Sequence, residues 1–300
     1  MKFYIVDAFT ENLFGGNPAG VVILEEGCDF PSGEAMKKTA AELRYSETAF
    51  IKKIGGDKFD IRYFTPADEV DLCGHATVGS FWALLDAGSV KEGGSYRIHT
   101  LAGELTVKVQ HGFVMMEMAA PECIKKIQDP AALEELYAVL GIPCESVAVQ
   151  QSCSQYVRLL PMIVSTGLPD IILPVKDRQT LEAVSPDFKA LSDLSQRYQA
   201  VGVHAFTLDR NSYDVTAHCR NFAPLYGIDE EAATGTSNGA LTYYLFAHDL
   251  IPDEKECAFI QGEAMGRPSK ILTHIKQAGD RPRIQVGGSA AILACGTIYL

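Results

Sequence analysis

Basic residues and long apolar runs are scarce in this chain of 300 residues. It has 26 Lys and Arg against 38 Asp and Glu, a formal net charge of −12. Such a surface repels nucleic-acid phosphates and anionic membranes, so we expect neither as a partner. No apolar run approaches the ~20 residues that span a bilayer, and the N-terminal MKFYIVDAF has no long apolar signal segment. We therefore expect a cytoplasmic protein.

Paired cysteines and nucleotide loops are also missing. The eight cysteines form no C-x-x-C pair, and no close Cys/His cluster has the spacing of a zinc site. Several lie in apolar runs such as AILACGTIYL, where a free thiol behaves as a small hydrophobe. The run GGNPAG lacks both the G-x-G-x-x-G spacing and a G-K-[ST] ending. We expect reduced thiols, no bound metal, and a turn between strands at GGNPAG.

Strand-forming segments are abundant, and helices are few. Hydrophobic residues make up 47% of the chain, enough for a large core. β-branched and aromatic runs bounded by Gly, Pro and Asp fill residues 1–120, and the pattern restarts after about residue 145. Helical patterns are widely spaced: GEAMKKTAAELR, HATVGSFWALLDA, DPAALEELYAVLGI, SPDFKALSDLSQRYQ and a long one near the second Gly-rich segment. This mixture predicts an α+β fold.

One pattern occurs twice along the chain. Phe64 recurs as Phe222, 158 positions later (222 minus 64), within F-x-P in both copies. The segment Cys73–His75 recurs as Thr234–Thr236, 161 positions later (234 minus 73). Each copy runs from a strand through an acidic loop into a helix that starts at Gly. The repeat predicts two similar domains with a pseudo-two-fold, 1–125 and 126–300, and the extreme C-terminal strand could pack with the first.

The two helix starts, at Gly74 and Gly235, predict a binding site. The first turn of a helix has backbone amides without intrahelical partners and carries partial positive charge. Two such starts facing each other across a cleft could hold a substrate carboxylate. The alternative is that both are simply well-capped helices. The partial positive charge at the helix start should keep His75 neutral. The alternative is that His75 is simply a capping or packing residue. Cys73 should have a lowered pKa, as a nucleophile or base needs.

Carboxylates near these starts are candidate acid/base groups. Glu47 precedes the apolar residues 49–51 at the entry to a strand, which predicts a raised pKa suited to proton transfer. A solvated strand-end glutamate is the alternative. Residues 229–231 add three carboxylates ahead of Gly235, although most such runs are solvated loops.

The motifs together resemble the phenazine-biosynthesis PhzF-like family, whose fold is shared with diaminopimelate epimerase and proline racemase. The resemblance covers nearly the whole length, through DAFTENLFGGNPAGVV, YSETAF, RYFTPADEVDLCGHAT, NFAP, ATGTSNGAL, QGEAMGRPSKI and VGGSA in order. It implies two domains, each a mixed β-sheet or barrel wrapped around a central helix, with the site in the cleft between them. It also implies an isomerase without metal or organic cofactor, often homodimeric. The best-known member moves a proton between ring carbons of trans-2,3-dihydro-3-hydroxyanthranilate.

The resemblance also implies roles for individual residues. The family's glutamate acid/base matches Glu47, and its Gly-His pair matches Gly74 and His75. Its motif E-D-P-A-T-G-S reads EEAATGT here, so Glu231 replaces an aspartate and Thr236 a serine. We therefore expect Glu47, His75 and Glu231 to be catalytic and Gly74, Gly235, Thr236 and Cys73 to bind a small carboxylate substrate.

Three other readings stay open. Cys73 matches the first cysteine of the two-cysteine epimerases, but Thr234 stands where the second would be, which disfavours a cysteine-based racemase. The aspartate-to-glutamate change leaves room for a small-molecule binding protein with an altered site. GTSNG fits the serine-hydrolase elbow with Ser237 as nucleophile, although the acidic residues before it are not a buried strand.

Overall fold

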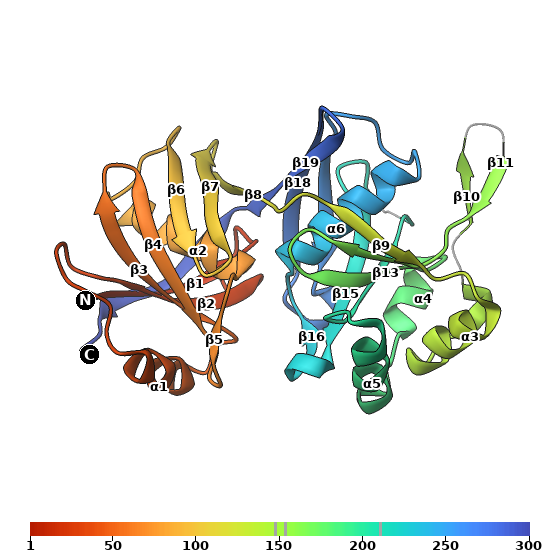
Figure 1. The fold of residues 1–300 in the computed structure, drawn as a ribbon, viewed down its shortest axis with the longest axis horizontal. Helices are drawn as coiled ribbons and strands as arrows, with labels where there is room; N and C mark the ends of the chain where they lie inside the picture. Colours follow the sequence, from red (N-terminus) through yellow and green to blue (C-terminus); the bar gives the residue numbers. More distant parts are fainter. Residues whose placement is uncertain (147–148, 153–154, 210–211) are drawn as a thin grey trace. The chain divides into compact units, whose positions relative to one another are not determined.

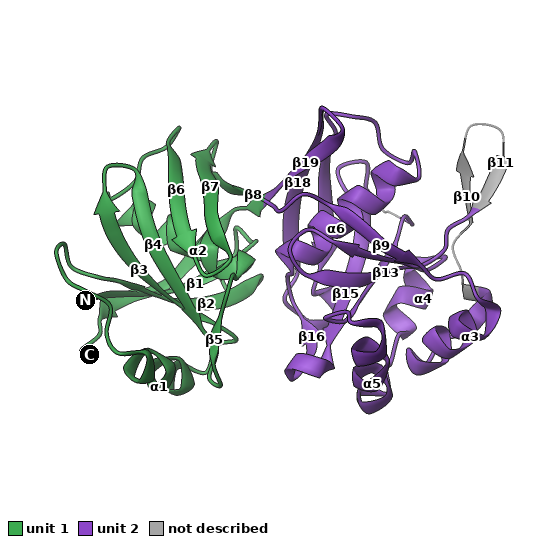
Figure 2. Cartoon of the chain, viewed as in Figure 1, with its two compact units in different colours: residues 1–117, 287–300 green, residues 118–286 purple. Residues whose placement is uncertain are grey.

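The computed structural model describes residues 1–146, 149–152, 155–209 and 212–300. They form two compact units, unit 1 with residues 1–117 and 287–300 and unit 2 with residues 118–286 (Figure 2). The predicted strand VAVQQ begins at residue 147, which is outside the described residues. Cys153 also lies outside them. None of the described helices is long and apolar enough to cross a bilayer.

Unit 1 contains two helices and most of the N-terminal strands (Figure 1). Its elements are β1 (Lys2–Ala8), β2 (Asn17–Ile23), α1 (Gly33–Leu43), β3 (Thr48–Gly55), β4 (Lys58–Phe64), β5 (Glu69–Val70), α2 (Gly74–Asp86), β6 (Ser95–Thr100), β7 (Gly103–Gln110), β8 (Phe113–Glu117) and the C-terminal β20 (Ala290–Thr297).

Unit 2 repeats this series with extra helices. Its elements are β9 (Glu122–Lys126), α3 (Pro130–Val139), β10 (Val149–Ser152), β11 (Gln155–Arg158), β12 (Met162–Ser165), β13 (Pro169–Pro174), α4 (Arg178–Ala183), α5 (Phe188–Tyr198), β14 (Val203–Thr207), β15 (Ala217–Ala223), β16 (Ile228–Glu231), α6 (Gly235–Ala247), β17 (Glu256–Gln261), β18 (Ser269–Ala278) and β19 (Arg281–Gly288), whose last residues belong to unit 1.

Strand pairing is the same in both units. β1 is antiparallel to β2 and β2 parallel to β3, and β12, β13 and β14 pair in the same way. β4 is antiparallel to β3 and β5 and parallel to β6. Correspondingly, β15 is antiparallel to β14 and β16 and parallel to β17. The predicted α+β fold with two similar domains is therefore confirmed.

The two repeats exchange their last strands. β9 follows the first repeat along the chain but pairs antiparallel with β12 of unit 2. β20 follows the second repeat but pairs antiparallel with β1 of unit 1. The chain thus passes from one unit to the other twice, after residue 117 and after residue 286.

A buried helix lies at the centre of each unit. α2 contacts β1, β2, β3, β8 and β20, and α6 contacts β12, β13 and β18. Both sequences are apolar or small all round, the pattern of a helix enclosed by other elements. Gly79 brings α2 close to the sheet, since an added Cβ would lie 3.4 Å from Val6 of β1. These helices fix the position of the residues at their first turns.

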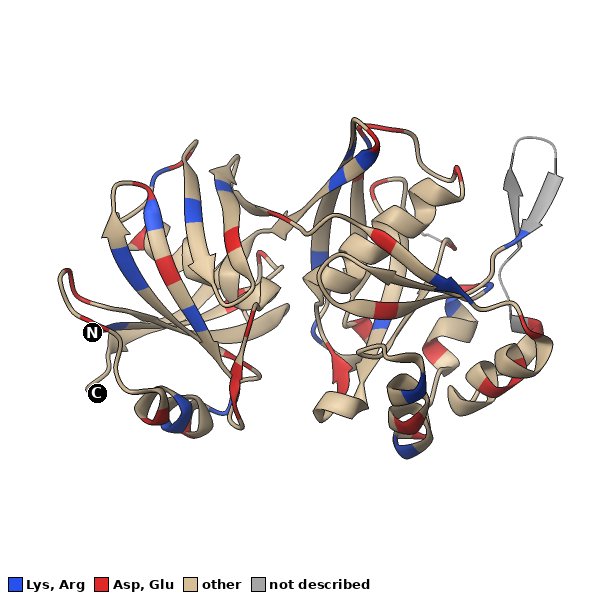
Figure 3. Ribbon diagram, viewed as in Figure 1, with Lys and Arg blue, Asp and Glu red and all other residues tan. Residues whose placement is uncertain are grey.

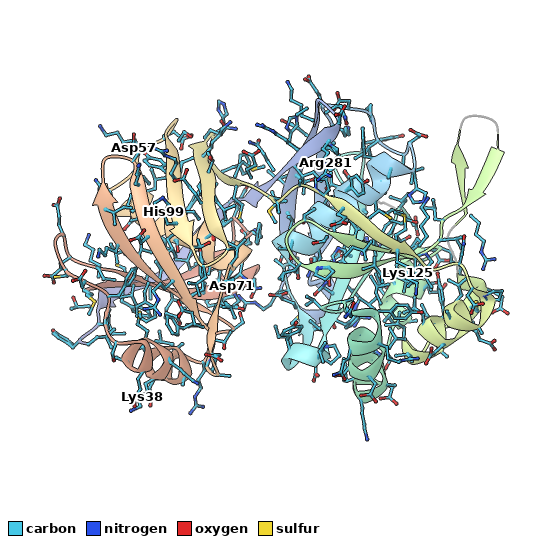
Figure 4. The ribbon with its side chains drawn as sticks, viewed as in Figure 1. Lys38, Asp57, Asp71, His99, Lys125 and Arg281 are labelled. Atoms are coloured by element: carbon cyan, nitrogen blue, oxygen red, sulfur yellow. The ribbon has the colours of Figure 1, made fainter. Side chains whose placement is uncertain are left out.

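The outer helices are capped as their sequences predict. Ser32 caps α1 by accepting from the Ala35 amide, and Asp129 caps α3 with Pro130 at the first helical position. Charged residues of both signs are interspersed along the elements of each unit (Figure 3). Lys38 of α1 is one of them (Figure 4), and it pairs with Glu34 one turn earlier at 2.7 Å. Such exposed pairs contribute little to stability.

Candidate functional site

Three elements of unit 1 bring the first group of predicted residues together. Glu47 follows α1 and precedes β3, which runs parallel to β2. The Gly20 amide of β2 donates to the Glu47 carbonyl at 3.3 Å, which fixes Glu47 beside that strand. β2 itself begins at Asn17, and α2 begins at Gly74. The segment between α1 and β3 and the starts of β2 and α2 therefore lie close together.

Glu47, Cys73 and His75 lie side by side there. Glu47 Oε2 is 3.2 Å from His75 Nε2, and the two side chains are 12% and 4% exposed. Cys73 Sγ lies 3.4 Å from His75 Nδ1 and 3.7 Å from Nε2. Two polar residues surround the ring: the Asn17 side-chain amide is 3.2 Å from Nδ1, and Ser46 Oγ is 3.3 Å from Nε2. The result is a largely enclosed cluster of ionisable groups.

The ionisation of Glu47 differs from the expectation. Burial raises the pKa of its carboxyl group, but His75, with help from Ser46 and Cys73, lowers it by more. The pKa therefore lies below its ordinary value, and the predicted raised pKa is wrong. The apolar residues 49–51 are adjacent in sequence, whereas His75 arrives through the fold.

The expectations for His75 and Cys73 are also wrong. Burial lowers the pKa of His75, but Cys73 and Glu47 raise it by more, and it lies well above its ordinary value. We therefore assign an imidazolium, because its acidic neighbours outweigh the helix start. Burial, with the Glu47 carboxylate, raises the pKa of the Cys73 thiol to about 11. The cluster at neutral pH is a carboxylate and an imidazolium beside a thiol.

The two central helices begin in the same way. Cys73 and Thr234 are the N-cap residues, both have extended backbones, and neither side chain makes a capping hydrogen bond. Neither helix start is thus closed by its N-cap side chain, and its use as a binding site stays a prediction. Gly74 and Gly235 each occupy the first helical position, as the repeat predicts.

The second group of predicted residues lies in unit 2. Glu231 ends β16, and its Oε2 accepts a hydrogen bond of 2.7 Å from Thr234 Oγ1. Gly235 is buried, and Thr236 is half-buried on the first turn of α6. The structure thus gathers Glu47, Cys73, Gly74 and His75 in one unit and Glu231, Gly235 and Thr236 in the other. That the two groups share one pocket stays a prediction.

Two residues that the sequence analysis missed hold the second group. Gln261 is fully buried, and its Nε2 donates to the Glu231 carbonyl at 2.7 Å and to Thr234 Oγ1 at 3.0 Å. Its Oε1 accepts from the Thr234 amide at 3.2 Å and from Asn238 Nδ2 at 2.8 Å. Gln261 lies in QGEAMGRPSKI and Asn238 in ATGTSNGAL, two motifs that carry the family resemblance. Their place in these motifs was the signal in the sequence that could have found them.

The serine-hydrolase reading is wrong. Ser237 is fully buried, and its Oγ donates to Asp170 Oδ2 at 2.6 Å while accepting from Asn221 Nδ2 at 3.1 Å. A nucleophile needs an exposed hydroxyl beside a base. Ser237 is instead part of a polar network inside unit 2.

Metal-ligating side chains gather in unit 1 although their sequence spacing gave no sign of it. Within the described part of the chain, Glu47, Cys73 and His75 offer ligand atoms that all lie within 4.8 Å of one another. The expectation of no zinc-type spacing concerned the sequence alone, and this grouping arises only in the fold. A separate hollow of about 740 Å³ in unit 2, lined by Leu250, Cys257 and Lys270 among others, involves none of the predicted site residues.

Comparison with known proteins assigns the chain to a family. The family model for phenazine biosynthesis-like proteins, PhzC-PhzF, matches residues 6–296. The chain is 32% identical over 290 residues to the uncharacterised isomerase YfhB of Bacillus subtilis, covering 95% of this chain and 94% of that protein. It is 30% identical over 306 residues to trans-2,3-dihydro-3-hydroxyanthranilate isomerase of Pseudomonas aeruginosa, covering 100% and 99%.

Solved structures extend the comparison. The PhzF-family phenazine biosynthesis protein of Bacillus anthracis superposes with a TM-score of 0.87 at 27% identity, covering 100% of this chain and 99% of that one. A hydroxyproline epimerase from Agrobacterium vitis, with 12% identity and a TM-score of 0.59 over 99% of this chain and 91% of that one, shares the fold. On the match over nearly its whole length, the chain belongs to the PhzC-PhzF family of phenazine biosynthesis-like proteins.

Proposed function

We propose that this chain is an isomerase that moves a proton between carbons of a small carboxylate-bearing substrate, with Glu47 as the acid/base and no organic cofactor. The observation that carries the proposal is the Glu47–His75 pair, 3.2 Å apart at the start of the central helix of unit 1. The names of its relatives, isomerases in Bacillus subtilis and Pseudomonas aeruginosa, support the reaction class.

In the proposed mechanism, a negative charge passes from Glu47 to the substrate and back while the His75 imidazolium stays in place. Glu47 removes a proton from an activated C–H, and the negative charge passes from its carboxylate to the substrate. His75 faces the charge before and after this step, so it stabilises the anion that develops on the substrate. Protonated Glu47 then returns the proton to a different carbon.

The helix starts supply the proposed binding groups. Backbone amides at Gly74 and Gly235 suit a substrate carboxylate. Thr236 adds a hydroxyl, and Glu231 suits an amino or hydroxyl group. Thr234 donates to the Glu231 carboxylate at 2.7 Å and orients it. Because Glu231 and Thr236 are each larger by one carbon than the family's usual aspartate and serine, we propose a substrate different from the phenazine precursor.

A cysteine-based racemase is a second candidate, favoured by the contact of 3.4 Å between Cys73 Sγ and His75 Nδ1. Two observations weigh against it. Burial raises the pKa of the Cys73 thiol to about 11, away from the thiolate form. The matching residue in the second repeat is Thr234, which has no thiol. Cys73→Ser should therefore retain most of the proton exchange, whereas a racemase would lose it.

The test is proton exchange measured with Glu47→Gln. Candidate carboxylate substrates are incubated with the protein in D2O, and deuterium incorporation is followed by NMR. Loss of a general acid/base should lower the exchange rate by about 10²–10⁴-fold. Glu42→Gln, at an exposed position on α1, is the matched control and should exchange at the parent rate. Full exchange in Glu47→Gln would rule out the assignment.

A further inference from the structure

Arg220 of β15 is fixed by hydrogen bonds from all three of its guanidinium nitrogens. Its Nε and Nη2 donate to the two carboxylate oxygens of Glu230, each at 2.8 Å. Its Nη1 donates to backbone carbonyls at the end of α4, those of Leu181 at 3.2 Å, Glu182 at 3.3 Å and Val184 at 2.7 Å. One side chain therefore joins α4, β15 and β16.

β16 has little other support from its own backbone. It is four residues long and pairs with β15 at two positions, with a register shift between them. The Arg220 and Glu230 side chains are 12% and 16% exposed, so water competes weakly for their ion pair. An arginine that binds a carboxylate through two parallel hydrogen bonds fixes its orientation as well as its distance. The pair therefore holds β16 in place.

Glu231 directly follows the residue that Arg220 holds. Successive side chains of a strand point to opposite faces. With Glu230 bound to Arg220 on one face, Glu231 is directed to the other, where Thr234 Oγ1 donates to its carboxylate at 2.7 Å. We propose that Arg220 is a positioning residue for Glu231 and acts through Glu230. This inference rests on the proposed function, in which Glu231 binds an amino or hydroxyl group of the substrate.

The first repeat contains the same ion pair without a site carboxylate beside it. Arg62 and Glu69 stand 158 and 161 positions earlier (220 minus 62 and 230 minus 69). Arg62 Nε donates to Glu69 Oε1 at 2.7 Å. Val70 follows Glu69, where unit 2 has Glu231. Within the described part of the chain Arg62 donates to Glu69 alone, and it is 32% exposed. The additional bonds to α4 therefore occur in the repeat that carries the site carboxylate.

Paired substitutions separate position from charge. Arg220→Met combined with Glu230→Gln removes the ion pair and leaves no buried charge without a partner. Arg62→Met combined with Glu69→Gln makes the same change in the first repeat and is the matched control. Arg220→Lys keeps the positive charge but lacks the planar fork that binds a carboxylate through two bonds. Circular dichroism checks that each variant is folded.

The first readout needs no substrate. Backbone hydrogen exchange and the carbon-13 signal of the Glu231 carboxyl group, assigned by its loss in Glu231→Gln, are measured on the full chain. In the Arg220 pair variant, amides of β16 should exchange about tenfold faster or more, as loss of a hydrogen bond to a charged group predicts. The Glu231 signal should move, while β13 keeps its protection. Arg220→Lys should behave like this variant, and the control should match the parent in β16.

The proposal would be overturned by parent-like β16 exchange with an unmoved Glu231 signal in the Arg220 pair variant. Parent-like behaviour of Arg220→Lys would also overturn it, because charge without the fork would then suffice.

The second readout is deuterium incorporation into candidate carboxylates in D2O. The KM for exchange should rise by about 10–100-fold in the Arg220 pair variant, with a smaller change in kcat, because a binding contact is lost. An unchanged KM beside a displaced Glu231 signal would make Arg220 structural only and contradict the proposal. If the parent protein exchanges no candidate, the proposed function fails, and the first readout still decides whether Arg220 directs Glu231.

Discussion

At the residue scale, Asp170 is a buried carboxyl group in the interior of unit 2. Its Oδ2 accepts from Ser237 at 2.6 Å, and the backbone amide of Gly202 also hydrogen-bonds to the carboxyl group. Burial raises its pKa to about 6. A group whose pKa is raised on folding binds more protons in the folded state, so its contribution to stability falls as pH rises from about 4 to about 6.

Asp170→Asn should remove this pH dependence. The variant should gain stability relative to the parent as pH rises from 4 to 7, by about 3 kcal/mol, since each pKa unit is worth about 1.4 kcal/mol. Urea unfolding of both proteins at pH 4, 5.5 and 7 measures it. His204, whose pKa burial lowers to about 3, contributes with opposite sign to both proteins and cancels in the difference. An equal stability difference at every pH would show that Asp170 does not titrate in this range.

At the element scale, a short 3-10 turn, η3 (Glu263–Met265), lies between two glycines with positive φ. Gly262 has φ +80, and a Cβ there would lie 2.5 Å from the Arg267 carbonyl and 2.7 Å from the Ala232 carbonyl. Gly266 has φ +66 but open space around it. The backbone at Gly262 therefore touches the loop that leads into α6.

This difference predicts unequal effects of alanine at the two positions. Gly266→Ala should cost about 1 kcal/mol, from the left-handed backbone alone. Gly262→Ala should cost at least about 2 kcal/mol more, because the clashing atoms are backbone and must shift. Thermal or urea unfolding of the two variants measures the gap. Equal destabilisation by the two variants would mean that the backbone of the loop before α6 shifts at little cost in free energy.

Gln261 gives a second prediction for this loop. Gln261→Leu keeps a similar volume but leaves the Thr234 amide without its side-chain acceptor, at about 1–3 kcal/mol for such a buried group. Asn238 Nδ2 loses one of its two acceptors and keeps the Thr234 carbonyl at 2.9 Å. Thr234 itself would lose one of the contacts that orient it toward Glu231. Hydrogen exchange should show faster exchange at the Thr234 amide, while β13, elsewhere in unit 2, keeps its protection. Unchanged protection at Thr234 would contradict the role assigned to Gln261.

The sequence predicted the positions of the secondary-structure elements better than the ionisation of the site residues. The repeat of Cys73–His75 as Thr234–Thr236 placed both central helices at the correct glycine, because the signal is local and occurs twice. The pKa directions of Glu47, His75 and Cys73 were all wrong, because each depends on partners that only the fold supplies. Glu47 lies 28 positions before His75 (75 minus 47), and nothing in the intervening residues indicates the contact. The buried role of Gln261 was hidden for the same reason.

At the scale of the whole molecule, the fold of unit 1 depends on the end of the chain. β20 pairs with β1 along Lys2–Ala8, whose core-facing side chains are fully or nearly fully buried. Removing residues 289–300 would expose that edge and its apolar neighbours. We expect loss of hydrogen-exchange protection in β1 and β2 and retained protection in α6. Removing only residues 298–300, which follow the strand, is the control and should leave β1 protected.

The exchange of last strands also has a historical consequence. A chain with a single repeat would lack the strand that completes its own unit, but two copies could each donate that strand to the other. The duplicated chain would then descend from an intertwined dimer whose halves became joined head to tail. Joining makes the donated strand a tethered partner, present at high effective concentration whatever the protein concentration. Separate expression of the two halves should therefore yield fragments that fold poorly alone and recover structure when mixed.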